Sequence, residues 1–203
     1  MSSENKDNSL LEMIKLGLIL VCYAVASCTV LAIVNNLTSP KIIQNQLVKA
    51  NLAMKAVFAE ADEFEKKDDF SRSEDKTITV SDFYLAKKDG SVVGGVVQVS
   101  GPTYEKGKII ISLDTNGVVK GMQFLELSDS PGFGLKANDS TYIMKNGKTF
   151  YGQFAGKDAN NGFVANENYD AISGATITSV AVGKLLNEGT KTLLMYFKEH
   201  DYE

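Results

Sequence analysis

Residues 170–179 read Asp-Ala-Ile-Ser-Gly-Ala-Thr-Ile-Thr-Ser and lead into a long amphipathic segment. Apolar residues recur there at helical spacing, which predicts a helix over about 178–198. A helix N-terminus offers unpaired N–H groups and a partial positive charge, and both stabilise a bound phosphate. Thr176, Thr178 or Ser179 can cap this helix through a side-chain oxygen. The stretch therefore predicts an anion site that needs no lysine, with an ordinary capped turn as the alternative.

The rest of the chain offers few groups for acid–base or metal chemistry. The 203 residues include one histidine, His200, and two cysteines, Cys22 and Cys28, which both lie in an apolar stretch. Zinc sites and iron–sulfur clusters need several Cys or His ligands, so we expect no metal site and no catalytic residue. A net charge of −4 disfavours nucleic acid as a partner, because binding it needs a clustered basic face. The composition favours chemistry supplied by a bound cofactor.

Residues 13–34 form an apolar stretch long enough to cross a hydrocarbon layer of roughly 30 Å. We expect an uncleaved transmembrane helix here, after a short N-terminus at residues 1–12. A cleaved signal peptide has a shorter apolar core. A lipoprotein signal at Val25-Ala26-Ser27-Cys28 conflicts with the apolar residues that continue to Val34. Lysines flank both ends about equally, so charge alone does not set the orientation.

Residues 35–76 are expected to connect this span to a folded domain at residues 77–203. Pro40 suits a helix start, and apolar residues at helical spacing predict a helix over 40–60 that covers its own domain or meets a partner subunit. The charged residues 60–76 predict a solvated connection.

The domain itself combines strand and helix patterns. Short β-rich runs separated by Asp89-Gly90, Gly101-Pro102 and Asn116-Gly117 predict hairpin-connected strands in a mainly antiparallel sheet. With the C-terminal helix, the predicted fold class is α+β. The expected strands are 77–87, 91–100, 107–114 and 117–126, followed by a helical patch near 138–145 and a Gly- and Asn-rich loop near 156–168.

Two motifs resemble those of the FMN-binding domain family. Ser173-Gly174-Ala175-Thr176, with Asp170 three residues earlier, is similar to the motif in which a threonine hydroxyl is joined to the phosphate of FMN. In that family the linked threonine directly follows Gly-Ala, which implies Thr176; Thr178 is the chemically equivalent alternative. Asp129-Ser130-Pro131-Gly132-Phe133-Gly134 resembles the family's Glu-Thr-Pro-Gly-Leu-Gly loop near the flavin ring. Asp, Ser and Phe replace Glu, Thr and Leu, which leaves the individual ring contacts open.

The order of these features is similar to that in G subunits of the Rnf electron-transport complex. The resemblance implies a single-pass protein of the cell (inner) membrane with a covalent FMN in an extracytoplasmic domain. It also implies electron transfer with other membrane subunits of a translocase that couples ferredoxin:NAD⁺ oxidoreduction to sodium or proton transport, no stand-alone activity, and a separate flavin transferase. The alternatives are the related C subunit of the sodium-translocating NADH:quinone reductase, another single-span FMN-domain reductase, and a tether without a cofactor.

Overall fold

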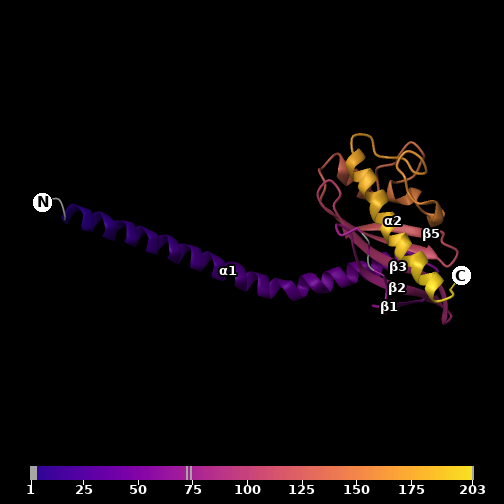
Figure 1. Ribbon diagram of the computed structural model, residues 1–203, viewed down its shortest axis with the longest axis horizontal. Helices are drawn as coiled ribbons and strands as arrows, with labels where there is room; N and C mark the ends of the chain where they lie inside the picture. Colours follow the sequence, from indigo (N-terminus) through magenta and orange to yellow (C-terminus); the bar gives the residue numbers. More distant parts are fainter. Residues whose placement is uncertain (1–3, 72, 74, 203) are drawn as a thin grey trace. The chain divides into compact units, whose positions relative to one another are not determined.

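The computed structural model describes residues 4–71, 73 and 75–202. The chain divides into two compact units, Met1–Val48 and Lys49–Glu203. A single helix, α1 (Glu4–Val57), supplies all the secondary structure described for the first unit and continues into the second (Figure 1).

The N-terminal part of α1 is apolar and long enough to cross a membrane, by length and composition alone. The prediction that a new helix starts near Pro40 is wrong, because Pro40 lies inside the 54-residue helix. Proline removes one N–H donor from a helix, but the turns on either side keep their own bonds. The Thr38 hydroxyl also donates to the Val34 carbonyl at 2.8 Å, one turn earlier in the same helix.

A five-stranded antiparallel sheet forms the centre of the second unit, with its strands in chain order. The four predicted strands are confirmed. A fifth, β1, lies in the segment expected to be a solvated connection. Its sequence, Glu-Phe-Glu-Lys-Lys, has no apolar alternation; pairing with β2 and ion pairs such as Lys66–Asp82 at 2.9 Å hold it at the edge. The strands are β1 (Glu63–Lys67), β2 (Thr79–Lys88), β3 (Ser91–Gly101), β4 (Gly107–Asp114) and β5 (Val119–Leu127).

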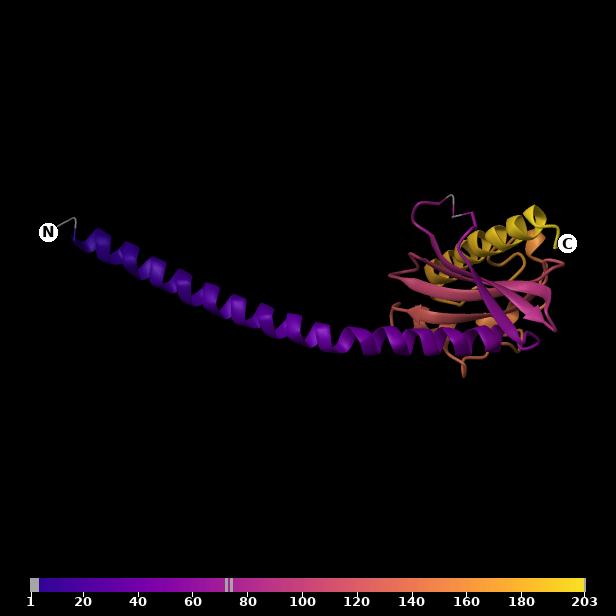
Figure 2. The same ribbon diagram turned by 90° about the horizontal axis from the view of Figure 1, so that it is seen from below.

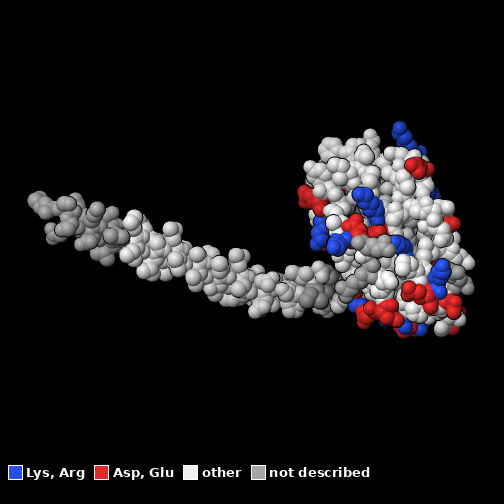
Figure 3. Space-filling view, viewed as in Figure 1, with Lys and Arg blue, Asp and Glu red and all other residues white. Residues whose placement is uncertain are grey.

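Charged residues on an edge strand oppose pairing with another chain. Figure 3 shows acidic and basic side chains next to one another over the lower edge of this unit, where Figure 1 places β1. The charged sequence of β1, which prevented its prediction as a strand, therefore suits its position at the edge of the sheet.

Both faces of the sheet are covered. The C-terminal helix α2 (Thr176–Glu199) confirms the predicted helix and packs on one face, mainly over β3 and β4. The last turns of α1 cover the opposite face, as Figure 2 shows. This confirms that the end of the predicted connecting helix covers its own domain. Its buried residues Ala53, Met54, Val57 and Phe58 cluster with Ala86, Val96, Ile110 and Leu125 of the sheet.

Between β5 and α2 the chain makes loops and short 3₁₀ helices. The predicted helical patch near 138–145 is wrong: the structure instead has η1 (Gly134–Asn138), η2 (Tyr151–Gln153) and η3 (Ala159–Asn161). With antiparallel strands and separate helices, the α+β class is confirmed.

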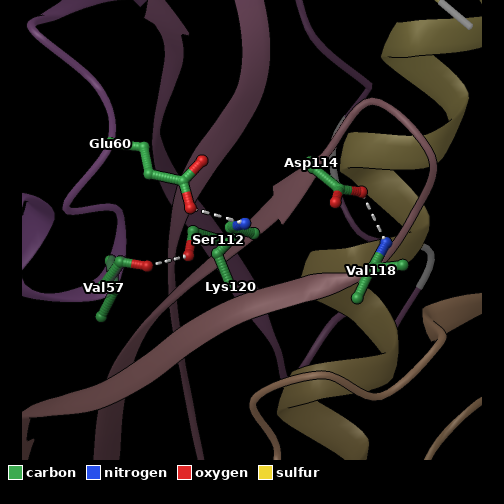
Figure 4. Close-up of polar contacts among 6 residues, drawn as sticks. All are labelled: Val57, Glu60, Ser112, Asp114, Val118 and Lys120. Carbon is green, nitrogen blue, oxygen red and sulfur yellow. Dashed lines mark hydrogen bonds and ion pairs between the residues drawn. The ribbon is translucent and has the colours of Figure 1, made fainter.

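The end of α1 is fixed to the sheet by one buried hydroxyl. Ser112 Oγ donates to the Val57 carbonyl at 2.6 Å, so a carbonyl at the helix C-terminus is satisfied (Figure 4). Gly121 lets the sheet approach the helix, because a Cβ there would lie 2.9 Å from Val57 Cα. Nearby, Lys120 and Glu60 form a more exposed ion pair at 3.0 Å.

We expect Ser112→Ala to destabilise the folded unit by about 1–3 kcal/mol, because it leaves a buried carbonyl without its donor. Lys120→Ala is the matched control: it removes an exposed ion pair, whose contribution is about 0–1 kcal/mol. Urea unfolding of both variants, followed by circular dichroism, measures the difference. An equal loss in the two variants would contradict the role given to Ser112.

Candidate functional site

A pocket of about 400 Å³ opens at the N-terminal end of α2. Three segments form it: the loop between β3 and β4, the loop after β5 at residues 129–134 (the Pro-Gly loop), and the turn that leads into α2. The first two meet because Gly107 pairs with Gly101 on one side and with Leu127 on the other. The pocket is lined by Tyr104, Ser130, Phe133, Gly134, Gly174, Ala175, Thr176, Ile177 and Thr178.

Asp129, predicted to belong to the flavin loop, is buried beneath the pocket and is not part of its lining. Its carboxylate accepts hydrogen bonds from the hydroxyls of Thr103 and Thr178, each at 2.5 Å. The backbone N–H groups of Glu105 and Tyr104 also donate to it, at 3.0 and 3.3 Å. One carboxylate therefore joins all three segments of the pocket.

These contacts set the ionisation of the carboxyl group. Burial acts to raise the pKa of Asp129, but the hydrogen bonds from Thr103 and Thr178, and from the Glu105 and Tyr104 amides, outweigh it. The pKa of Asp129 therefore lies below its ordinary value, because every donor around it favours the charged form. Asp129 is an ionised acceptor and a poor proton acceptor at neutral pH.

We expect Asp129→Asn to destabilise the folded unit at neutral pH, and the difference from wild type to shrink below about pH 4. The folded-state pKa is lowered, so the carboxylate stabilises the fold above the unfolded-state pKa of about 3.9. That stabilisation is lost as the pH falls through the folded-state pKa. Urea unfolding at several pH values measures the difference. Asp139→Asn is the control for burial: hydrogen bonds from Thr141 also lower the pKa of Asp139, but its carboxylate is exposed and bonds only within its own loop, so the pH-dependent difference should be smaller.

The helix N-terminus is arranged differently from the capping prediction. Ala175 is the N-cap residue and no side chain caps it, so the capping role predicted for Thr176, Thr178 or Ser179 is wrong. Thr178 is 2% exposed and donates to Asp129. Ser179 is buried, accepts from the Ile172 N–H at 2.9 Å and donates to the Ala175 carbonyl at 2.9 Å. Both hydroxyls are engaged in other hydrogen bonds, which leaves the first-turn N–H groups without a side-chain acceptor.

Thr176 is the exposed threonine of the lining. Within the described residues its hydroxyl has no hydrogen-bond partner. It occupies the first position of α2, beside N–H groups that lack intrahelical acceptors. Gly174, with φ +80°, makes the tight turn before it.

Only some residues of the Pro-Gly loop line the pocket. Ser130, Phe133 and Gly134 line it, and the Phe133 side chain is 57% exposed. Pro131 and Gly132 are exposed and lie outside the lining. Gly134 packs directly against the Asp129 contacts, because a Cβ there would lie 2.6 Å from both Asp129 Cβ and Thr178 Oγ1.

The start of the Ser-Gly-Ala-Thr segment is anchored outside the pocket. Ser173 is exposed and does not line it. The buried Gln153 side chain accepts from the Asp170 N–H at 2.8 Å and donates to the Asp170 carbonyl at 3.0 Å. Asn146 donates to the Asp170 carboxylate at 2.9 Å. Sequence reasoning missed Gln153 and Asn146, since nothing local marks them.

Thr103 and Tyr104 were also missed. They follow the Gly101-Pro102 turn, which was interpreted only as a strand boundary. Tyr104 lines the pocket with 60% of its side chain exposed, and Thr103 is buried against Asp129. The turn does mark the loop, but only the sheet register brings it beside the Pro-Gly loop.

The residues present fit FMN. The uncapped start of α2 suits a phosphate, because its N–H groups and helix dipole favour an anion. The exposed rings of Tyr104 and Phe133 provide flat surfaces for an aromatic ring system, and the exposed side chain of Ile177 adds apolar surface. Thr176 has an accessible hydroxyl at this helix N-terminus.

Comparison with known proteins gives two family matches along the chain. Residues 1–57 match the RnfG N-terminal region, and residues 104–191 match the FMN-binding domain. The second match contains the whole lining of the pocket.

Curated relatives cover nearly the whole chain. The G subunit of the sodium-translocating ferredoxin:NAD⁺ oxidoreductase complex of Acetobacterium woodii is 30% identical over 192 residues, which are 85% of this chain and 87% of the relative. The G subunit of the proton-translocating ferredoxin:NAD⁺ oxidoreductase complex of Clostridium ljungdahlii is 26% identical over 200 residues, 96% and 97% of the two chains. The G subunit of an ion-translocating oxidoreductase complex of Shewanella piezotolerans is 28% identical over 200 residues, 93% and 91% of the two chains. The chain therefore belongs to the family of G subunits of Rnf ion-translocating oxidoreductase complexes, with an FMN-binding domain at its C-terminal side.

Proposed function

We propose that this protein is a redox subunit of an ion-translocating ferredoxin:NAD⁺ oxidoreductase and carries FMN linked through its phosphate to Thr176. The single observation that carries the proposal is the accessible Thr176 hydroxyl at the uncapped N-terminus of α2, inside the pocket. When bound, FMN supplies one- and two-electron transfer; the protein supplies the position and surroundings of the ring.

The contrast between the two threonines supports Thr176 as the linked residue. Thr178 also lines the pocket, but its hydroxyl is buried and donates to Asp129 at 2.5 Å. A hydroxyl next to a carboxylate can be an activated nucleophile. Here, however, the pKa of Asp129 is lowered by its donors, which makes it a weak base. The Thr176 hydroxyl, by contrast, is accessible from the pocket and makes no hydrogen bond within the described residues.

The attachment reaction is a phosphoryl transfer to Thr176 Oγ1. A new bond forms between Oγ1 and the phosphorus of the flavin nucleotide. A phosphoanhydride bond of a flavin dinucleotide donor breaks, the nucleoside monophosphate leaves, and the hydroxyl proton passes to a base or to solvent. The protein offers no general base within its own pocket lining among the described residues, so we assign proton removal to a separate flavin transferase.

The linked phosphodiester retains one negative charge. The free N–H groups of the first turn of α2 and the helix dipole would hold it in place. Tyr104 and Phe133 would contact the flavin ring and shield part of it from water. Covalent attachment would prevent loss of the cofactor to the extracytoplasmic space, the side of the membrane on which we propose that the domain lies.

The part of α1 that belongs to the second unit runs along the sheet from its pocket end. Lys49 donates to the Leu125 carbonyl, near the point where β5 runs into the Pro-Gly loop. Val57 lies at the other end, beside Ser112 and Gly121. The chain therefore enters this unit at the end of the sheet that bears the pocket.

The decisive experiment is intact mass of the full chain produced with a flavin transferase, together with flavin fluorescence of the denatured band. A mass increase of one FMN less one water supports the linkage, and peptide mapping identifies the threonine. Absence of an adduct would favour a tether, or an FMN held without a covalent bond. Protease protection in sealed vesicles tests the extracytoplasmic location.

A further inference from the structure

We propose that Asp129 is the positioning residue of the flavin pocket: its buried carboxylate holds the pocket's three segments in register without touching the cofactor. The inference rests on the proposed function and adds to it a residue that lies outside the pocket lining.

The first segment held by Asp129 is the loop between β3 and β4. The Thr103 hydroxyl and the Glu105 N–H share Asp129 Oδ1, at 2.5 and 3.0 Å. The Tyr104 N–H reaches Oδ2 at 3.3 Å. Three consecutive residues thus donate hydrogen bonds to one carboxylate. These bonds fix the backbone at Tyr104, whose ring is exposed in the pocket.

The second segment is the start of α2. Thr178 Oγ1 donates to Asp129 Oδ2 at 2.5 Å, only two residues after Thr176. A hydrogen bond between a hydroxyl and an ionised, buried carboxylate is among the stronger protein hydrogen bonds. It therefore fixes the distance between the attachment turn and the loop that contains Asp129.

The Pro-Gly loop itself is the third segment, and Gly134 closes it over the carboxylate. A Cβ at Gly134 would lie 2.8 Å from Asp129 Oδ2 and 2.6 Å from Thr178 Oγ1. The loop therefore packs down on the hydrogen-bonded pair itself, and this fixes the backbone next to the exposed Phe133. The same buried carboxylate, that of Asp129, therefore positions three residues of the pocket: Tyr104, Phe133 and Thr176.

An ionised carboxylate suits this position better than an amide. All four contacts to it are donors, and a carboxylate offers acceptor oxygens only. An asparagine would turn its NH₂ group toward some of these donors. The Asp129→Asn change keeps the size of the side chain and replaces one of its two acceptor oxygens with an NH₂ donor, so it tests positioning with little change in volume.

The experiment measures flavin attachment and flavin environment in full-length Asp129→Asn protein. Transferase kinetics give KM and kcat for the protein substrate, and fluorescence yield reports the ring surroundings after loading. Loosened segments lower the fraction of attachment-competent protein, which raises the apparent KM. We expect KM to rise roughly tenfold, the factor set by one lost hydrogen bond to a charged group. We expect kcat to stay nearly constant and the flavin fluorescence to move toward that of free FMN.

Asp114→Asn is the matched control. Asp114 also accepts two backbone N–H bonds, from Asn116 at 3.1 Å and Val118 at 2.9 Å. It ends β4 at the opposite end of the sheet from the pocket, and Figure 4 shows its contact with Val118. Its loss should leave KM and flavin fluorescence at wild-type values.

Wild-type KM and fluorescence in Asp129→Asn would overturn the inference, as would equal changes in Asp114→Asn. If Asp129→Asn does not fold, the Thr178→Val variant tests the inference instead, because it keeps the carboxylate and removes one of its hydrogen bonds. A fluorescence shift in the same direction supports the inference, and an unchanged spectrum contradicts it. A wild-type chain that takes up no flavin is a different result, because it rejects the proposed function itself.

Discussion

Thr176→Ala abolishes covalent flavin and leaves the domain folded; this is the expected result with the largest effect on function. The substitution removes the acceptor oxygen, and no other threonine hydroxyl of the pocket lining is exposed. Thr176 is exposed and its hydroxyl makes no contact within the described chain. The change in unfolding free energy should therefore be within about 0.5 kcal/mol. Intact mass and in-gel flavin fluorescence measure the loss of flavin.

Two variants control this result. Thr176→Ser keeps a hydroxyl and should retain the adduct. Thr178→Val removes the buried hydroxyl and should also retain it, with peptide mapping to Thr176. An adduct that survives Thr176→Ala but disappears in Thr178→Val would move the linkage to Thr178. That outcome would also require the buried Thr178 hydroxyl to leave its hydrogen bond with Asp129 before it reacts.

Gly134→Val should disrupt the pocket and destabilise the domain, which is the largest structural effect we expect at the pocket. A Cβ at this position would lie 2.6 Å from Asp129 Cβ and from Thr178 Oγ1. These atoms belong to buried side chains that other contacts hold in place, so the clash cannot be relieved by a simple rotation. Overpacking of this kind destabilises proteins by about 1–3 kcal/mol. Flavin attachment should fall with it, because the start of α2 shifts relative to the Pro-Gly loop.

Gly132→Ala is the control in the same loop. A Cβ at Gly132 would meet nothing within 4 Å, although its φ of +76° disfavours a side chain. This variant should show the moderate cost of backbone strain alone, roughly 1 kcal/mol, and keep flavin attachment. Thermal unfolding and intact mass distinguish the two variants. Equal loss of flavin in both would show that loop strain matters more than packing on Asp129.

Local patterns in the sequence predicted much of the fold. The runs that became β2 to β5 show strand composition between turn signals, and α2 shows helical periodicity, so each was recognisable without its neighbours. The attachment segment was likewise visible, because Ser173-Gly174-Ala175-Thr176 and the helix after it are contiguous. Strand β1 was missed, since only pairing with β2 makes its charged sequence a strand.

By itself, then, the sequence determined the apolar span, the antiparallel strands, the final helix and the Pro-Gly and Ser-Gly-Ala-Thr segments. The tertiary structure decided what the polar residues of those segments do. Thr176 and Thr178 are the same residue type and lie two positions apart. Yet Thr176 is exposed, whereas Thr178 is hydrogen-bonded to Asp129, 49 residues earlier in the chain. Such a contact depends on the register of the sheet and the packing of α2 on it, and both are set by interactions between distant residues.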